Sequence, residues 1–249
     1  MSNTNASDDK QRFADFVEFA AQNEFVPMRE LIYRYMREAI ITRRFKTGHH
    51  LVEEDLAKQL NASRTPVREA LRKLESEGLV KHHRRRGVEV RQMTVKDASD
   101  VYDLCAVLEG YAARLTAENL NHGDSVLRLQ NFLNEMKNAI DSNNIILEAH
   151  YHKKWHIALY ESCQNNKLET LLKNYSEYLR LFRTYSVKVP GRMWHSWEEH
   201  EKIYRAIEMR DGALAEQSAR NHLEMGKESF IMQWENTLKE QLIEDEIFD

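Results

Sequence analysis

The sequence of 249 residues is poor in the residue types that interrupt helices, with 8 glycines and 3 prolines. Because these residues mark turns and irregular loops, their scarcity predicts long helices with short connections. Cysteine is rarer still, and Cys105 and Cys163 provide no disulfide framework, which fits a reducing cytoplasm. The segment MSNTNASDDK lacks the apolar core of a secretion signal, and no apolar run is long enough to span a membrane. We therefore expect a cytoplasmic, mainly α-helical protein without a membrane partner.

Positive charge is concentrated in one part of the chain. Residues 26–93 contain 16 Lys and Arg against 9 Asp and Glu, whereas residues 94–249 contain 18 against 26. A basic segment joined to an acidic one is typical of a protein in which only one domain binds nucleic acid. A chance distribution of solvated charge would give similar counts, so the assignment depends on the motifs within these segments.

The basic segment has the element order of a winged helix-turn-helix. Residues 1–25 are expected to be a flexible segment containing a short amphipathic helix, and residues 26–93 the DNA-binding domain. Gly78 suits a left-handed helix end, and Gly87 suits a sharp return between two strands. The expected elements are a helix after Pro27, a helix over 51–60, a second helix over 63–78, and strands at 79–80 and 88–90 around the basic tip KHHRRRG.

The helix over 63–78 is the candidate recognition helix. Such a helix presents its N-terminal residues to base edges and phosphates in the major groove. Arg64 and Arg68 are four residues apart on one face, and arginine pairs bidentately with guanine, while the hydroxyls of Ser63 and Thr65 suit phosphates. Ser63 or Thr65 is also expected to cap the helix. The wing would place further residues over the DNA backbone or minor groove: His83, Arg84, Arg85, Arg86 and Gly87.

Everything after Thr94 is expected to be helical. Breaks near residues 121–123, 141–144, 164–166, 190–191 and 211–212 divide this part into six helices. Residues 94–240 would then form an all-α six-helix bundle, followed by a tail at 241–249.

Four histidines in this bundle form a candidate metal site. His152 and His156 lie four residues apart, on one helix face. His200 and His222 lie eleven residues on either side of Asp211, so two antiparallel helices would bring them to the same level, about 16 Å from the turn. Four converging imidazoles suit Zn or another first-row divalent metal. The alternative is that these are ordinary surface or capped histidines, which are common in a chain with 11 of them.

The run GHHLVEEDLAKQLNASRTPVREALRKLESEGLVKHHRRRGVEV, from Gly48 to Val90, resembles the GntR family of bacterial regulators. The resemblance implies a homodimer that binds double-stranded operator DNA through Arg64, Thr65 and Arg68, most often as a repressor. Some relatives carry a further DNA-contacting arginine in the preceding helix. This sequence has Glu54 there, so that contact is not expected.

Residues 94–235 resemble the FCD effector domain of the FadR-type branch, and six helices favour its VanR-like subgroup. The resemblance implies a metal held by one Asp and three His, at positions occupied here by His152, His156, His200 and His222. His152 thus replaces the aspartate. Zinc is the expected ion, with Ni, Mn or Fe as alternatives.

The same resemblance points to an acidic effector. Cys105 stands where relatives often have an arginine that meets such an effector, and Arg180 and Arg183 are the remaining candidate carboxylate anchors. The expected function is therefore transcriptional repression whose strength changes when a small organic acid binds beside the metal. A metal-responsive regulator is the first alternative. A metalloenzyme using the His cluster is the second, although a closed four-His site leaves little room for a reacting water.

Overall fold

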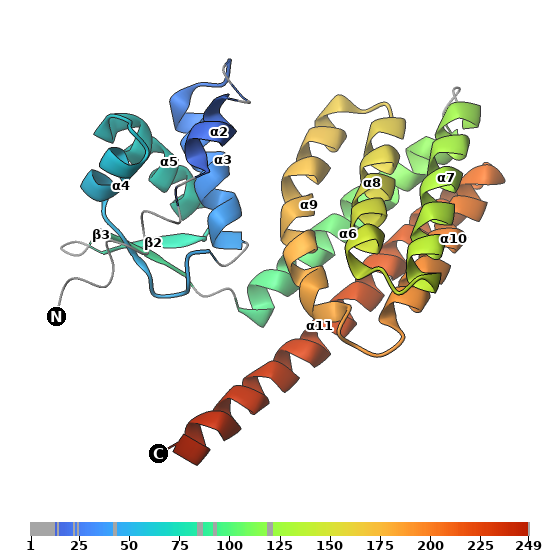
Figure 1. The fold of residues 1–249 in the computed structure, drawn as a ribbon. Helices are drawn as coiled ribbons and strands as arrows, with labels where there is room; N and C mark the ends of the chain where they lie inside the picture. The colour runs from blue at the N-terminus through green and yellow to red at the C-terminus, as the bar shows by residue number, and fades with distance from the viewer. Residues whose placement is uncertain are drawn as a thin grey trace. The chain divides into compact units, whose positions relative to one another are not determined.

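The computed structural model describes residues 13–248 except 14, 22, 24, 42–43, 84–86, 92–93 and 119–121. The chain divides into two compact units, Met1–Met93 and Thr94–Asp249. The elements of the first unit are α2 (Phe16–Ala21), α3 (Met28–Ile41), β1 (His50–Leu51), α4 (Glu53–Gln59), α5 (Arg64–Ser76), β2 (Val80–His83) and β3 (Gly87–Val90). Those of the second are α6 (Val95–Glu118), α7 (His122–Asp141), α8 (Ile145–Ser162), α9 (Asn166–Ser186), α10 (Arg192–Glu208) and α11 (Gly212–Phe248) (Figure 1).

The first unit has the winged helix-turn-helix fold expected from the sequence. Helices α3 and α5 pack against each other through the apolar faces that their 3.6-residue periodicity predicted. On α5, the core-facing residues are Val67, Ala70, Leu71 and Leu74, all of which are buried. Gly78 ends α5 with a φ of +72°, the left-handed conformation expected there.

The wing contains one strand more than predicted. The sheet has the order β1-β3-β2, and Leu51 of β1 pairs with Val88 of β3. The sequence placed residue 51 in the following helix, which instead begins at Glu53. A two-residue strand has no periodicity of its own and exists here only because β3 supplies its hydrogen-bonding partner.

Part of the N-terminal segment that was expected to be flexible packs on the DNA-binding unit. Phe13 and Phe16 are buried, and the Phe16 ring meets the Tyr35 ring of α3 edge-on at 5.0 Å between centroids. The short amphipathic helix expected within this segment is present as α2. Residues 1–12 lie outside the described part of the chain.

Over its described residues, the second unit is a bundle of six helices, as predicted, with breaks at the expected places. Helix α6 packs most extensively against α11, and the core is filled by side chains such as Trp155, Leu159 and Ile203. The predicted tail at 241–249 is not separate, because α11 continues through Phe248 and extends beyond the other helices of the bundle (Figure 1). Within the described residues, no helix is both long and apolar enough to cross a membrane.

Candidate recognition helix and histidine centre

The N-terminus of α5 presents its predicted DNA-binding residues to solvent. Ser63, Arg64, Thr65 and Arg68 are all exposed. Ser63 occupies the N-cap position, but its side chain makes no capping hydrogen bond, contrary to the expected role. Thr65 lies inside the first turn and does not cap either. Both hydroxyls therefore remain available to accept or donate hydrogen bonds to a phosphate.

Acidic residues of α4 hold the two arginines of α5. Arg68 donates from Nε and Nη2 to the Glu53 carboxylate, with the shortest distance, Nη2 to Oε2, at 2.8 Å. The Arg68 hydrogen bonds lower the pKa of Glu53. Arg64 lies 4.0 Å from Glu54. The first turn of α4 therefore orients the side chains that the sequence assigns to base contact.

The wing is described at its base. His83 Nε2 lies 2.7 Å from Glu89 on the neighbouring strand. Gly87 has a φ of +79°, and a Cβ there would lie 2.9 Å from the Leu51 carbonyl oxygen, so glycine fits both the turn and the close approach of β1. The predicted tip residues Arg84, Arg85 and Arg86 lie outside the described residues.

The four histidines of the bundle converge. His152 and His156 come from α8, His200 from α10 and His222 from α11. One ring nitrogen from each lies within 4.8 Å of the others. The His200 and His222 rings are 4.3 Å apart between centroids, so the two residues equidistant from the α10–α11 turn do meet.

The outer nitrogens of three of these rings face fixed acceptors. His200 Nδ1 donates to the Ser196 carbonyl at 2.6 Å, because a carbonyl can only accept. His222 Nδ1 lies 2.7 Å from Glu199 Oε2, and His156 Nδ1 lies 2.6 Å from Glu109 Oε1. Protonation at Nδ1 leaves each Nε2 with a lone pair. This is the outer-shell pattern that orients histidine ligands around a metal.

The inner nitrogens fit a cation. His156 Nε2 and His200 Nε2 are 3.1 Å apart. With both Nδ1 atoms protonated, two lone pairs face each other, which a positive charge would relieve. Zn–N bonds of about 2.0–2.1 Å at tetrahedral angles would place two nitrogens roughly 3.3 Å apart. Burial, together with the Arg183 charge and the neighbouring imidazoles, lowers the pKa of His152 well below its usual value, and burial does the same for His200. Both rings are therefore neutral and able to bind a metal near pH 7.

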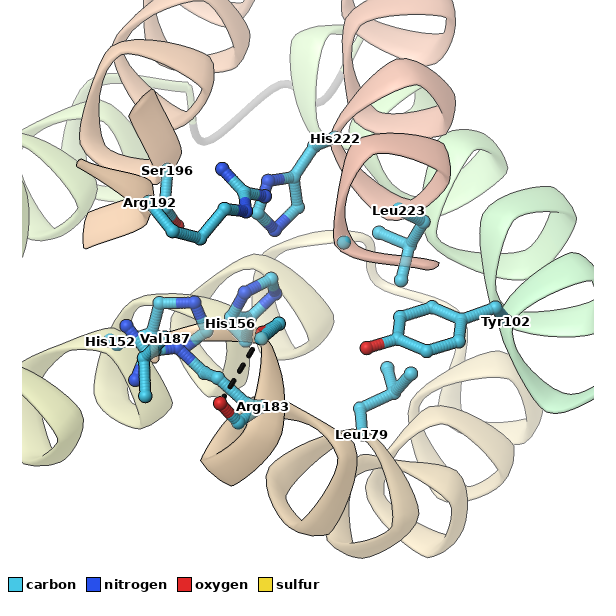
Figure 2. Close-up of a pocket in the computed structure, with 12 residues that line it drawn as sticks. Tyr102, His152, His156, Leu179, Arg183, Val187, Arg192, Ser196, His222 and Leu223 are labelled. Atoms are coloured by element: carbon cyan, nitrogen blue, oxygen red, sulfur yellow. Dashed lines mark hydrogen bonds between the residues drawn. The ribbon is translucent and has the colours of Figure 1, made fainter. Parts of the chain in front are cut away.

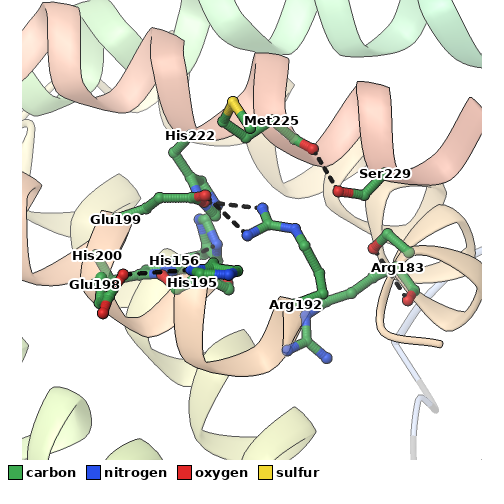
Figure 3. Close-up of polar contacts among 12 residues, drawn as sticks. His156, Arg183, Arg192, His195, Glu198, Glu199, His200, His222, Met225 and Ser229 are labelled. Carbon is green, nitrogen blue, oxygen red and sulfur yellow. Dashed lines mark hydrogen bonds and ion pairs between the residues drawn. The ribbon is translucent and has the colours of Figure 1, made fainter. Parts of the chain in front are cut away.

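Buried acid–base pairs surround the histidines. Glu109 is fully buried and accepts a hydrogen bond from the Tyr160 hydroxyl, while Glu199 receives two from Arg192. Burial alone would raise the pKa of Glu109, but its interaction with the His156 ring lowers it. Figure 3 shows Arg192, Glu199 and His222 as a connected set. Sequence reasoning missed these partners, although Glu199 directly precedes a candidate ligand.

Two cavities adjoin the histidines. Their lining residues show which of the predicted effector contacts could reach a bound molecule. Arg183 lines both, and it donates to Glu148 at 2.5 Å. Arg180 lines only the larger cavity and pairs with Glu177. Cys105 is fully buried and is not among the residues lining either cavity, so its predicted contact with an effector has no support in the geometry.

The smaller cavity lies directly against the histidines, with room for about 50 Å³. Tyr102, one turn before Cys105 on α6, reaches it, as does Arg192 (Figure 2). Sequence reasoning named neither residue. A tyrosine in an apolar stripe is indistinguishable from a core residue, and the histidine signal did not extend to Arg192.

Comparison with known proteins identifies both units. Residues 28–90 match the model described as bacterial regulatory proteins of the gntR family, and residues 100–225 match that of the FCD domain. An uncharacterized HTH-type transcriptional regulator, YdhC of Bacillus subtilis (strain 168), is 27% identical over 191 residues, covering 76% of this chain and 85% of its own. A probable D-xylose utilization operon transcriptional repressor of Paenarthrobacter nicotinovorans is 29% identical over 185 residues, or 72% and 78% of the two chains.

A solved structure has the same fold. The E. coli McbR/YncC structure superposes with a TM-score of 0.65 at 18% identity, covering 84% of this chain and all of the other. The matched families and relatives are transcriptional regulators, so this chain is a DNA-binding regulator and the metalloenzyme alternative falls. The chain belongs to the GntR family of bacterial regulatory proteins, in the branch that carries a C-terminal FCD domain.

Proposed function

We propose that this protein is a homodimeric repressor, acting in the cytoplasm, whose affinity for its operator changes when a small carboxylate binds beside a zinc ion in the helical domain. The observation that carries the proposal is the convergence of four imidazoles, three of them backed by acceptors, beside a cavity that Arg183 and Arg192 line. Repression is favoured by the relative named as a probable operon repressor.

The DNA-binding half of the proposal rests on α5. Its exposed Arg64 and Arg68 lie on one face, and the wing follows directly. Two such helices in a symmetric dimer would read the two halves of a pseudo-palindromic operator. A ligand changes operator affinity only if it binds the two states of the dimer with different affinity.

The metal would be held by His152, His156, His200 and His222. When bound, zinc would supply a Lewis-acid anchor for an effector oxygen. Glu109, Ser196 and Glu199 hold three of the rings in the tautomer with a free Nε2.

The charge balance of the site favours a singly charged anion. Glu148 pairs with Arg183 and Glu199 with Arg192, whereas Glu109 faces the His156 ring, so with neutral imidazoles one net negative charge remains. A divalent cation with four neutral imidazoles would turn this into one net positive charge. Because an unpaired charge in a buried site is costly, a bound monoanion would complete the balance.

The decisive experiment uses an operator selected from random double-stranded DNA by the zinc-loaded protein. Operator affinity is then measured by fluorescence anisotropy for metal-free protein, for zinc-loaded protein, and for zinc-loaded protein with a panel of short carboxylates. We expect a carboxylate to weaken operator binding only when zinc is bound. If zinc alone changes operator affinity and no carboxylate does, the protein is a metal-responsive regulator instead.

A further inference from the structure

The larger of the two cavities, called the chamber below, lies between α8 and α9. It has room for about 390 Å³, within the range of roughly 300–1,000 Å³ found for small-molecule pockets. Five of its lining residues also line the smaller cavity beside the histidines: His152, His156, Leu179, Arg183 and Val187. The two cavities therefore meet at Arg183.

The chamber is lined by charged groups, imidazoles and apolar side chains, together with Tyr160, Ser176 and Thr184. At the inner end lie the imidazoles and the Arg183 guanidinium, whose side chain is 15% exposed. The walls carry Ile145, Ala149 and Ile157 of α8, opposite Leu179 and Val187.

The outer end is occupied by an ion-pair cluster. Glu177 accepts from Lys153 at 3.1 Å and from Arg180 at 2.8 Å. All three residues line the chamber, and Lys153 and Arg180 are about half exposed. Both cations are therefore already bonded to the Glu177 carboxylate, and the cluster keeps one net positive charge. Among the lysines and arginines that line the chamber, Arg183 alone is mostly buried.

From this arrangement we propose that the α8–α9 chamber holds the apolar body of the effector, which is an amphiphilic monocarboxylate whose carboxylate meets Arg183. This inference rests on the proposed function and specifies its ligand. Arginine has five N–H donors, so Arg183 can keep its hydrogen bond to Glu148 and still bind the ligand. A short hydroxy acid would fill only the small cavity and leave the apolar walls without a partner.

The test measures the affinity of zinc-loaded, full-length protein for straight-chain monocarboxylates from acetate to octanoate by calorimetry. Each buried methylene is expected to tighten binding about fourfold, until the chamber is full. Octanedioate serves as the comparison, and it should bind more weakly than octanoate because its second carboxylate must either leave water for the apolar walls or compete with Glu177 for Lys153 and Arg180. A dissociation constant that is flat with chain length, or tighter binding of the diacid, overturns the proposal.

Two variants on the same helix localise the effect. Ala149→Trp fills the chamber and should remove the gain from chain length while acetate still binds. Ile146→Trp is the matched control, because Ile146 is 86% exposed and does not line the chamber. If Ala149→Trp keeps the full gain, the apolar body binds elsewhere and the proposal fails.

The wild-type series separates this inference from the function on which it rests. If acetate binds but longer acids gain nothing, only the inference falls. If none of the acids binds, the carboxylate effector of the proposed function falls with it.

Discussion

Glu53 of α4 accepts hydrogen bonds from Arg68 of α5 at both carboxylate oxygens: Oε2 lies 2.8 Å from Nη2 and 3.0 Å from Nε, and Oε1 lies 3.2 Å from Nε. The arginine is nevertheless half exposed at the start of the recognition helix. Its guanidinium is thus oriented before DNA arrives. Because Glu53 orients the arginine that is proposed to read a base, it should affect the sequence specificity of DNA binding as well as its affinity.

Arg68→Ala should weaken binding to the selected operator by about 1–3 kcal/mol, the usual value of a bidentate base contact. Glu53→Gln should act differently. Removing its negative charge strengthens binding to unrelated DNA, while the loss of orientation relaxes discrimination at the base that Arg68 reads. Anisotropy titrations with single-base operator variants measure both effects.

Asp55→Asn provides the control for Glu53→Gln, since it removes one charge from the same exposed turn. If both variants relax base discrimination equally, the effect is one of charge alone and Glu53 does not position Arg68.

Substitutions at two glycines of the wing separate backbone strain from a steric clash. Gly48 and Gly87 have nearly the same positive φ, but only at Gly87 would a Cβ meet backbone, 2.9 Å from the Leu51 carbonyl oxygen. Gly48→Ala should cost about 1 kcal/mol of stability, the usual cost of this conformation. Gly87→Ala should cost more, by pushing β1 away. Chemical denaturation of both variants measures the loss in the free energy of unfolding. Equal losses would mean that β1 moves away from the new Cβ without a measurable cost.

The recognition helix could be predicted because its signals are local. The spacing of Val67, Ala70, Leu71 and Leu74 sets its buried face, and Gly78 ends it. The convergence of the histidines could also be predicted, since one pair shares a helix face and the other is symmetric about the α10–α11 turn. Both predictions, of the recognition helix and of the histidine cluster, follow from the geometry of α-helices alone.

The surroundings of the histidines could not be predicted in the same way. Glu109 lies on the buried face of α6, in a position where the sequence favours an apolar residue, and its partners come from α8. Only tertiary packing shows that Tyr160 and His156 compensate its charge. Cys105 is the opposite case, because its sequence position resembled a ligand contact, whereas its side chain is fully buried and lines neither of the two cavities described.

The outer partners of the histidines should control metal affinity. Glu199→Gln weakens the acceptor for His222 Nδ1 and should reduce zinc affinity about 10–100-fold, as is typical of outer-shell changes. Competition with a chelating dye gives the affinity. The neighbouring Glu198→Gln is the matched control, because Glu198 pairs only with the exposed His195 among the contacts described. Equal zinc affinity in the two variants would mean that Glu199 does not support a ligand.

Acid should destabilise the metal-free protein before it reaches the usual carboxylate range. Burial, as the largest cause, lowers the pKa of His152, His200 and His222 in the folded state below the usual histidine value of about 6.5. The unfolded chain therefore binds more protons than the folded chain as pH falls below that value, so the free energy of unfolding decreases with it. Denaturation of metal-free protein between about pH 5 and 7.5 should show this loss.

Zinc should counteract that loss, and His152→Asp tests how. Metal binding requires neutral imidazoles, so zinc and protons compete, and the lowered pKa values move this competition below 6.5. An aspartate has a much lower intrinsic pKa, near 3.9, so His152→Asp should retain zinc to a lower pH than the wild type. The readout is protein-bound zinc after equilibration at each pH, measured by elemental analysis. His195→Asp, at an exposed histidine outside the cluster, should leave the release midpoint unchanged. Identical midpoints for wild type and His152→Asp would mean that His152 is not a ligand, and a wild type without stoichiometric zinc after reconstitution would remove the metal from the proposed function.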